Sequence, residues 1–321
     1  MTLRRLAKTT ALLLGTALAA GLAAPAAQAQ QFINILTGGT SGVYYPLGVA
    51  LSEIYADNID GARTQVQATK ASVENLNLLA QGSGELAFAL GDAVQLAWEG
   101  NEEAGYPAEL TGLRAIAAIY PNYVQIVASA DSGVETLADL EGKAVSVGAP
   151  ASGTELNARA IFAAADMSYD DLGRLEYLPY AESAELIKNR QLDATLQSSG
   201  LGVAFIKDLT ATHEINIVSI PAEVVESIGA PYVPSVIPAG TYDGQDEDVP
   251  TAAIGNILVT HDGVDEETAY QMTKLLFENL DRMVASHSAA EGISLEGATE
   301  GLPIPLHPGA ERYYREQGVL Q

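Results

Sequence analysis

The chain contains no cysteine among its 321 residues. This absence excludes disulfide bridges, and it also excludes a lipid anchor attached to an N-terminal cysteine. Basic residues are scarce as well, because 16 lysines and arginines stand against 41 acidic residues, which gives a formal net charge of −25. Since no basic stripe is present, we expect neither nucleic acid nor an anionic membrane surface as a partner.

The motifs of common enzyme classes are also missing. The chain has no G-x-S-x-G nucleophile elbow, no G-x-G-x-x-G loop after a strand and no phosphate-loop lysine motif. No two of its four histidines have the spacing of metal ligands, and the acidic clusters around residues 243–248 and 261–266 fit no calcium loop. We therefore expect a protein without cofactor or metal that is not an enzyme. Catalysis by a pair of buried carboxylates stays open, but no pair is singled out.

The first residues have the pattern of an export signal. A basic head ending at Lys8 precedes an apolar run at residues 11–24, and a small-x-small motif ends at Ala29. The apolar run is too short for a membrane span of about 20 residues. We interpret residues 1–29 as a signal peptide cleaved near Ala29, so the expected compartment is the periplasm. The remaining length suggests two domains of about 150 residues each.

After the signal, two stretches of the chain repeat one order of elements. Strands alternate with amphipathic helices, which predicts an α/β fold with parallel sheets in two lobes. The first stretch predicts strands at 32–36, 63–68 and within 82–90, with helices from Pro46 and from an N-cap at Ser72. The second predicts strands at 144–148, 174–180 and 191–197, with helices at 156–167 and after Ser183.

Glycine- and serine-bearing loops follow the first strand of each stretch, at residues 37–42 and 149–154. Two further polar loops, 69–72 and 180–183, follow the next strands. Ligand sites of parallel sheets lie beyond the carboxyl ends of the strands, so the four loops are expected to meet in a cleft. Each loop leads into a helix N-terminus, whose free N–H groups favour a small anion.

The last third of the chain is the least regular. Residues 215–250 are rich in proline and glycine and predict irregular chain, whereas 251–260 predicts a strand and 266–284 a long helix. We expect this segment to return to the first lobe. The expected division is then lobe I at 30–123 plus 221–321, and lobe II at 124–220.

Each candidate site residue also has a purely structural alternative. The glycines of loop 37–42 can serve a tight turn alone, and Ser152 can simply cap its helix in a capping box with Glu155. Lys70 can be solvated, and Tyr44 can belong to the core. Because both lobes carry such loops, we favour ligand contact, with Tyr44 pointing into the cleft.

Five segments resemble one known family in its own order along the chain. These are GGTSGVYYPLG, TKASVENLNLLAQG, ADSGVETLADLEGKAVSVGAPASGTELNAR, GTYDGQDEDVPT and IPLHPGAERYYREQG. The chain resembles the TAXI-type solute receptors of tripartite ATP-independent periplasmic (TRAP) transporters. The resemblance implies a type II periplasmic-binding-protein fold whose two lobes close around a small carboxylate similar to glutamate, 2-oxoglutarate or a dicarboxylate. It further implies delivery of this anionic solute to the permease subunits of the transporter, by a receptor expected to be a monomer.

The resemblance also implies ligand-binding residues, carried over motif by motif. Lys70 is added as a counter-charge from its place in the TKAS loop. The resulting set is Thr40, Ser41, Val43, Tyr44, Lys70, Ser72, Val73, Ser152, Gly153, Thr154, Ser198, Ser199 and Gly200.

The chain departs from the family pattern at three places beside the expected site. Thr195 and Leu196 stand where aromatic residues are usual, residues 200–202 replace a Gly-x-Pro, and Lys70 replaces a small residue. These departures leave the identity of the ligand open. Two alternatives to the TRAP receptor also stay open: an exported enzyme on the same scaffold, and a receptor for an ATP-driven transporter.

Overall fold

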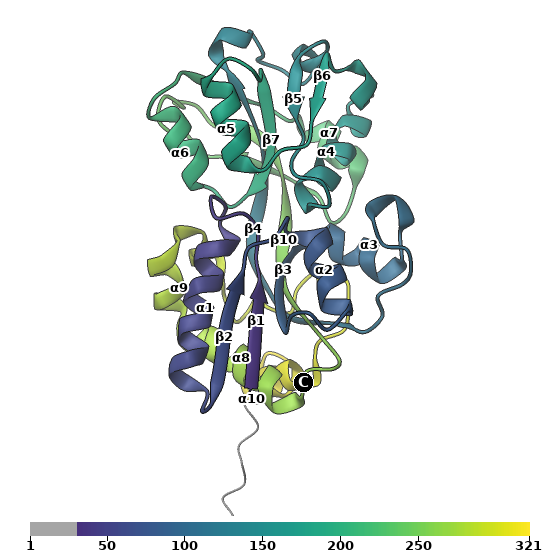
Figure 1. Ribbon diagram of the computed structural model, residues 1–321, viewed down its shortest axis with the longest axis vertical. Coiled ribbons are helices and arrows are strands. Elements are labelled where there is room, and N and C mark those ends of the chain that lie inside the picture. Colours follow the sequence, from purple (N-terminus) through teal and green to yellow (C-terminus); the bar gives the residue numbers. More distant parts are fainter. Residues whose placement is uncertain (1–30) are drawn as a thin grey trace, which may run out of the picture.

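The computed structural model describes residues 31–321, so the expected signal peptide lies outside the described residues. Two α/β lobes stack along the long axis of the molecule, and two long strands run from one lobe into the other (Figure 1). These strands are β4 (Leu113–Ser129) and β10 (Val249–His261), which pair antiparallel along most of their length.

Lobe I is built on a sheet in the order β2-β1-β3-β10-β4. Strand β1 pairs parallel with both β2 and β3, whereas β10 runs antiparallel to β3. Its elements from the first part of the chain are β1 (Gln31–Leu36), α1 (Tyr44–Asn58), β2 (Ala62–Gln67), α2 (Ser72–Ala80), β3 (Leu86–Leu90) and α3 (Gly91–Glu99). Its elements from the C-terminal part are α8 (Glu266–Glu278), α9 (Leu280–Ser286) and α10 (Pro308–Glu316).

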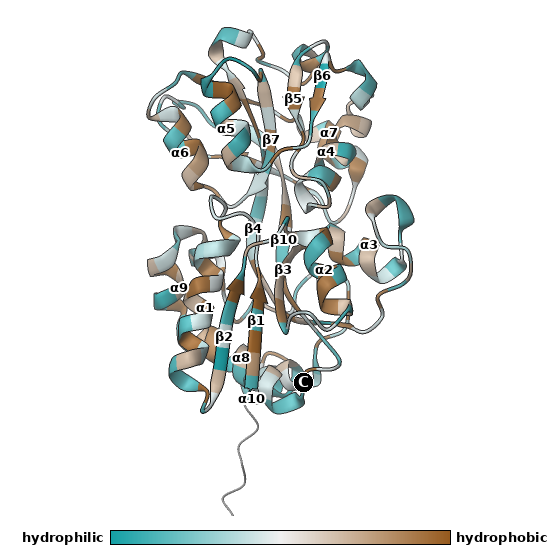
Figure 2. Ribbon diagram, in the orientation of Figure 1, coloured by the Kyte–Doolittle hydropathy of each residue, from teal (hydrophilic) through white to brown (hydrophobic). Residues whose placement is uncertain are grey.

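Helices cover both faces of the lobe I sheet. Helices α1, α8 and α9 contribute to one apolar cluster, and α2 and α3 contribute to another. The sequence LAFAL of β3 is buried along its whole length, as expected for a strand covered on both sides. Figure 2 shows the same pattern, with hydrophobic residues on the central strands and hydrophilic residues on the outward faces of the helices.

Lobe II continues the sheet from β4 in the order β7-β5-β6. Strand β8 also pairs with β4, and β9 pairs with the first half of β10. The elements are β5 (Ala144–Ser146), α4 (Gly153–Ala164), β6 (Arg174–Glu176), α5 (Tyr180–Lys188), β7 (Ala194–Ser199), α6 (Ala204–Thr210), β8 (Ile215–Val218), α7 (Ala222–Ile228) and β9 (Val233–Ile237). Short 3-10 helices lie at Glu102–Ala104, Ala130–Ser132, Ala138–Leu140, Tyr169–Asp171 and Ser288–Gly292.

The segment predicted as irregular chain contains regular elements, and part of it packs on lobe II. It contains β8, α7 and β9, and its apolar residues Ile220, Val225 and Tyr232 share a buried cluster with Val124. Short elements bounded by proline show no clear hydrophobic period, which is why the sequence pattern missed them. We propose that the chain returns to lobe I within β10, near Gly255, and not at residue 221.

Three other expectations differ from the structure. The helix predicted at 266–284 is interrupted at Asn279, whose backbone angles (φ −128°, ψ 30°) are not helical. The strand predicted at 174–180 ends at Glu176, and α5 already begins at Tyr180. Strand β4 has no counterpart among the predicted elements, although it carries the connection between the lobes.

The two long strands are least regular where they pass between the lobes. Gly255 of β10 lies opposite Pro121 of β4, and the register shifts between Gly255 and Ile257. Proline has no N–H to donate to the ladder, and glycine adds backbone freedom. This pair therefore interrupts the regular ladder of hydrogen bonds between the lobes.

His307 offers a test of the lobe I core. It is buried, its Nε2 atom lies 2.9 Å from the Val264 carbonyl, and its Nδ1 atom accepts the Gly309 N–H at the start of α10. Burial lowers the pKa of the His307 imidazole, so the ring is neutral in the folded protein. His307→Ala is expected to lower the free energy of unfolding by about 1–3 kcal/mol.

The same imidazole sets a pH dependence. Because its pKa is lowered on folding, the unfolded chain binds the proton more readily, and stability is lost as the pH falls from about 7 to 5. Urea denaturation at both pH values should therefore show a smaller loss in His307→Ala than in the wild type. Equal losses in the two proteins would contradict this assignment.

Candidate functional site

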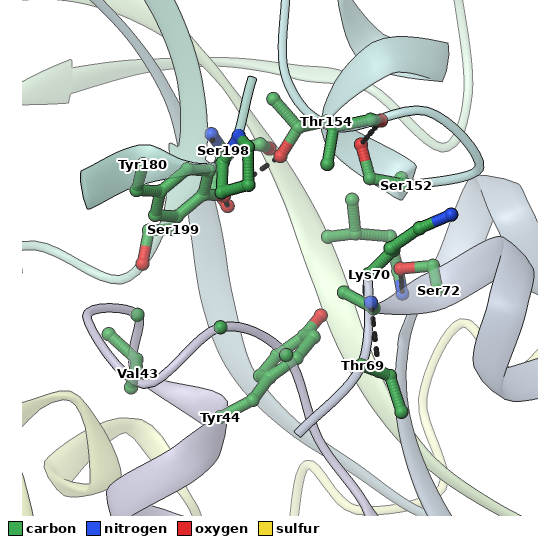
Figure 3. A pocket seen from close by; sticks show the side chains of 18 of the residues that line it. Val43, Tyr44, Thr69, Lys70, Ser72, Ser152, Thr154, Tyr180, Ser198 and Ser199 are labelled. Carbon is green, nitrogen blue, oxygen red and sulfur yellow. Dashed lines mark hydrogen bonds between the residues drawn. The ribbon is translucent and has the colours of Figure 1, made fainter. Parts of the chain in front are cut away.

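A cavity of about 170 Å³ lies between the two lobes. Lobe I contributes the loop before α1 and the loop before α2, and lobe II contributes the N-termini of α4 and α5 and the end of β7 (Figure 3). The lining residues are Gly38, Gly39, Gly42, Val43, Tyr44, Thr69, Lys70, Ala71, Ser72, Leu90, Asn122, Ala149, Ser152, Gly153, Thr154, Pro179, Tyr180, Ser198 and Ser199.

Most of the predicted site residues meet at this cavity. Those that line it are Val43, Tyr44, Lys70, Ser72, Ser152, Gly153, Thr154, Ser198 and Ser199. Their contact with a ligand stays a prediction.

Four predicted residues are not among the lining residues. Thr40 is exposed and Ser41 is partly exposed on the loop before α1. Val73 is buried in the apolar cluster under α2, and Gly200 packs against Ala289, Tyr120 and Val43.

Some lining residues were not named by the sequence analysis. Asn122 lies on β4, the strand that the pattern did not reveal. Tyr180 belongs to a loop that was expected at the cleft, but the local sequence does not distinguish this tyrosine from a core residue. The departures at Thr195 and Leu196 are buried within lobe II and do not line the cavity, whereas Lys70 does.

The loop before α2 is held in an unusual backbone conformation. Ala71 has φ 73° and ψ −142°, a region that favours glycine and costs an alanine about 1–3 kcal/mol. The predicted N-cap, Ser72, is instead the first residue of the helix, and its hydroxyl accepts the N–H of Leu90 at 3.1 Å. The Glu74 carboxylate accepts the Lys70 N–H at 2.6 Å and so holds the loop before α2 against the first turn of the helix.

The N-terminus of α4 faces the same cavity from lobe II. The Ser152 hydroxyl accepts the N–H of Glu155 at 3.1 Å, so this residue caps the helix as expected. The capping box is only half formed, because the Glu155 carboxylate pairs with Arg159 at 2.7 Å and bonds to Tyr169. The Ser152 hydroxyl donates its own hydrogen to the Ala149 carbonyl at 2.7 Å.

A tyrosine from each lobe lines the cavity. Tyr44 stacks on Phe88 with 5.1 Å between ring centroids, and its hydroxyl donates to Asn256 Oδ1 at 2.5 Å. Tyr180 packs on Phe205, and its hydroxyl donates to the Ser198 carbonyl at 2.6 Å. Burial raises the pKa of Tyr44 and of Tyr180, so both hydroxyls are neutral at physiological pH.

The charge at the cavity differs from that of the whole chain. Among the lining residues of the described chain, Lys70 is the one charged side chain, and none is aspartate or glutamate. The N-termini of α2 and α4 add partial positive charge from their free N–H groups. A chain with a large negative charge thus presents a locally positive, hydroxyl-rich cavity.

Direct contacts hold the lobes together around this cavity. The Glu74 N–H of α2 donates to the Ala151 carbonyl of lobe II at 3.1 Å. A Cβ added at Gly153 would lie 2.5 Å from Ser72 Oγ and 2.7 Å from Leu90 Cδ1, both in lobe I. The absence of a side chain at this position is what lets the α4 N-terminus approach lobe I so closely.

The described residues 31–321 contain no group of three histidine or acidic side chains arranged to hold a metal ion. Within the same range, no helix combines the length and apolarity that a membrane crossing requires. The residues that line the cavity supply hydrogen bonds and the positive charge of Lys70 toward a small molecule.

Solved structures with the same arrangement identify the class of fold. A binding protein component of an ABC phosphonate transporter from Pseudomonas aeruginosa aligns with a TM-score of 0.55, at 12% identity over 85% of this chain and 84% of the other. A protein from Bordetella bronchiseptica RB50 aligns with a TM-score of 0.54, at 15% identity over 90% of this chain and 89% of the other.

The fold is the two-lobe α/β fold of periplasmic binding proteins of type II, as the family resemblance implied. A family model matches residues 35–318, almost the whole described chain. The protein belongs to the NMT1-like family.

Gly153 offers a test of the closed arrangement. In Gly153→Ala the new methyl group collides with Ser72 and Leu90, so the lobes cannot approach as closely as in the wild type. We expect a ligand found by screening to bind at least about tenfold more weakly, because closure then costs more than about 1.4 kcal/mol. Small-angle scattering should show the liganded variant to be more extended than the liganded wild type.

Gly39→Ala is the matched control for this test. Gly39 also lines the cavity, but a Cβ at this position meets nothing within 4 Å. The control should keep the wild-type scattering profile. A Gly153→Ala protein that closes and binds as the wild type does would show that this contact does not limit closure.

Proposed function

We propose that the protein is a periplasmic solute receptor that captures a small carboxylate by closing its lobes and releases it unchanged to a membrane transporter. The observation that carries the proposal is the cavity between the lobes, where two helix N-termini and one lysine converge and no acidic side chain is present. Its volume of about 170 Å³ is smaller than the roughly 300–1,000 Å³ of sites for drug-sized ligands. A molecule of a few carbon atoms suits such a space.

Carboxylate binding would use the N–H groups at the two helix starts. Free N–H groups at a helix N-terminus point along its axis and favour an anion. Ser72 and Val73 begin α2, and Gly153 and Thr154 begin α4, on opposite sides of the cavity. Lys70 would add a counter-charge at the rim, where it is exposed.

The transporter partner has two candidates. The five segments quoted above resemble TAXI-type receptors, which favours a TRAP permease driven by an ion gradient. The Pseudomonas aeruginosa protein of similar fold is described as a component of an ABC phosphonate transporter, which favours an ATP-driven partner. We retain the TRAP permease as the first candidate and the ABC transporter as the second, and the expected receptor is a monomer.

A ligand screen tests the receptor function. The mature protein, beginning after Ala29, would be heated with amino acids, keto acids, hydroxy acids, dicarboxylates, sulfonates and phosphonates in turn. A true ligand at 100 times its Kd should add about 2.7 kcal/mol of apparent stability. The hit would then be incubated with the protein and analysed by mass spectrometry, and recovery of a product would favour the exported-enzyme alternative.

Lys70→Gln tests the role of the counter-charge. Lys70 is exposed, so the substitution should leave the melting temperature of the ligand-free protein unchanged. Affinity for the acid is expected to fall about three- to tenfold, since a partly solvated ion pair contributes about 1 kcal/mol. Lys188→Gln is the control, because Lys188 lies on α5 away from the lining residues. Equal affinities of wild type and Lys70→Gln would show that Lys70 is a solvated side chain that does not contribute to ligand binding.

Reconstituted transport separates the two partners. The receptor would be added to vesicles that carry either candidate transporter from the same organism. Uptake of the labelled ligand that needs a sodium or proton gradient and persists without ATP would support the TRAP partner. Uptake that needs internal ATP would support the ABC partner.

A further inference from the structure

A buried carboxylate lies behind the cavity, between the lobes. Asp92, in the first turn of α3, is 5% exposed. Its Oδ1 atom accepts the Ala93 N–H at 2.8 Å, and its Oδ2 atom accepts Asn157 Nδ2 at 2.7 Å and the Tyr232 hydroxyl at 2.6 Å. Asn157 and Tyr232 belong to lobe II, so this lobe I carboxylate is held by donors from the opposite lobe.

Asn157 links this carboxylate to the cavity. Because Asp92 Oδ2 accepts hydrogen bonds, Asn157 must turn its NH₂ group toward it, and its Oδ1 atom must then face the other way. There it accepts the hydrogen of the Ser198 hydroxyl at 2.5 Å. Ser198 lines the cavity, and its oxygen also accepts Asn122 Nδ2 at 2.6 Å. The Ser198 hydroxyl therefore donates its hydrogen within the protein. One lone pair of its oxygen remains to accept a hydrogen bond.

Two other cavity hydroxyls are directed in the same way. The Tyr120 carbonyl accepts Asn256 Nδ2 at 2.9 Å, which turns Asn256 Oδ1 toward the hydrogen of Tyr44. The Tyr180 hydroxyl gives its hydrogen to the Ser198 carbonyl, so Thr154 Oγ1, 2.8 Å away, must be the donor in their contact. Tyr44, Thr154 and Ser198 therefore all offer lone pairs to a ligand, and their hydrogens are already bonded.

We infer that Asp92 is a positioning residue for ligand selection: through Asn157 it fixes Ser198 as a hydrogen-bond acceptor, so the receptor prefers acids that carry a donor next to the carboxylate. This inference rests on the proposed function. Thr154 lies in the first turn of α4, so a carboxylate bound at that helix start puts its C2 substituent beside these acceptors. A C2 hydroxyl donates to them, whereas a C2 keto oxygen meets lone pairs and is disfavoured.

Asp92→Asn reverses the chain of hydrogen bonds without removing it. The introduced amide would keep its oxygen on the Ala93 N–H and place its NH₂ group toward Asn157 and Tyr232. Asn157 would then turn over, accepting from both neighbours and donating its NH₂ to Ser198. The Ser198 hydrogen would become free to point into the cavity, and the hydroxyl would become a donor toward the ligand.

The experiment compares two acids with one carbon skeleton, 2-hydroxyglutarate and 2-oxoglutarate, by calorimetric titration of the mature protein. The wild type is expected to bind the hydroxy acid about tenfold more tightly. Its C2 hydroxyl gains one neutral hydrogen bond, whereas the C2 keto oxygen of the other acid faces acceptors. In Asp92→Asn this ratio should fall to about one or invert. A merely structural role of Asp92 would weaken both acids equally and leave the ratio unchanged.

Two further variants keep the test decisive. Tyr232→Phe removes one donor to Asp92 and also the Tyr232 hydroxyl that accepts Asn157 Nδ2 at 2.8 Å. Because Asp92 Oδ2 still accepts Asn157 Nδ2, the orientation of Asn157 is retained, and this control should keep the wild-type ratio. Asn157→Ala frees the Ser198 hydrogen by a second route and should lower the ratio, even where Asp92→Asn does not fold. Binding of both acids with the wild-type ratio in Asn157→Ala and Asp92→Asn would overturn this inference alone. Failure of the wild type to bind either acid, while another compound class binds, would overturn the carboxylate proposal and this inference together.

Discussion

The approach of two helix N-termini across the cleft is the constraint on which the site depends. The Glu74 N–H reaches the Ala151 carbonyl of the other lobe, and Gly153 fits against Ser72 because it has no side chain. In this arrangement the starts of α2 and α4 face one small cavity. Neither helix N-terminus encloses the cavity alone, because residues of both lobes line it.

The acidity of the chain and the positive character of the cavity are compatible because they act over different distances. A net charge of −25 repels anions at long range, but salt screens that field beyond about 8 Å. Inside the closed cavity the nearest groups dominate, namely N–H dipoles, hydroxyls and Lys70. Asp92 does not line the cavity, and its carboxylate is bonded to Ala93, Asn157 and Tyr232 behind the cavity wall.

Regular alternation of strands and helices made much of the fold predictable. The strands predicted at 32–36 and within 82–90 are short apolar runs bounded by turn residues, and the helices after them have clear periods. The structure contains these elements with shifted ends. Strand β4 escaped detection because it crosses two lobes and is buried along much of its length, which removes the alternation that marks a strand. Residues 215–250 escaped for another reason, since their short elements between prolines are stabilised by packing on lobe II and not by local preference.

The sequence by itself determined the glycine- and serine-rich loops, the helices that follow them and hence the chemistry available at the cleft, because these depend on neighbours along the chain. Tertiary structure alone decided that Asn122 and Tyr180 join the cavity and that Asp92 reaches Ser198 through Asn157. Asp92 and Asn157 are 65 positions apart, and Asn122 and Ser198 are 76 apart. The direction of a hydroxyl hydrogen depends on which acceptor lies beside it in space, and no local pattern of residues encodes that neighbour.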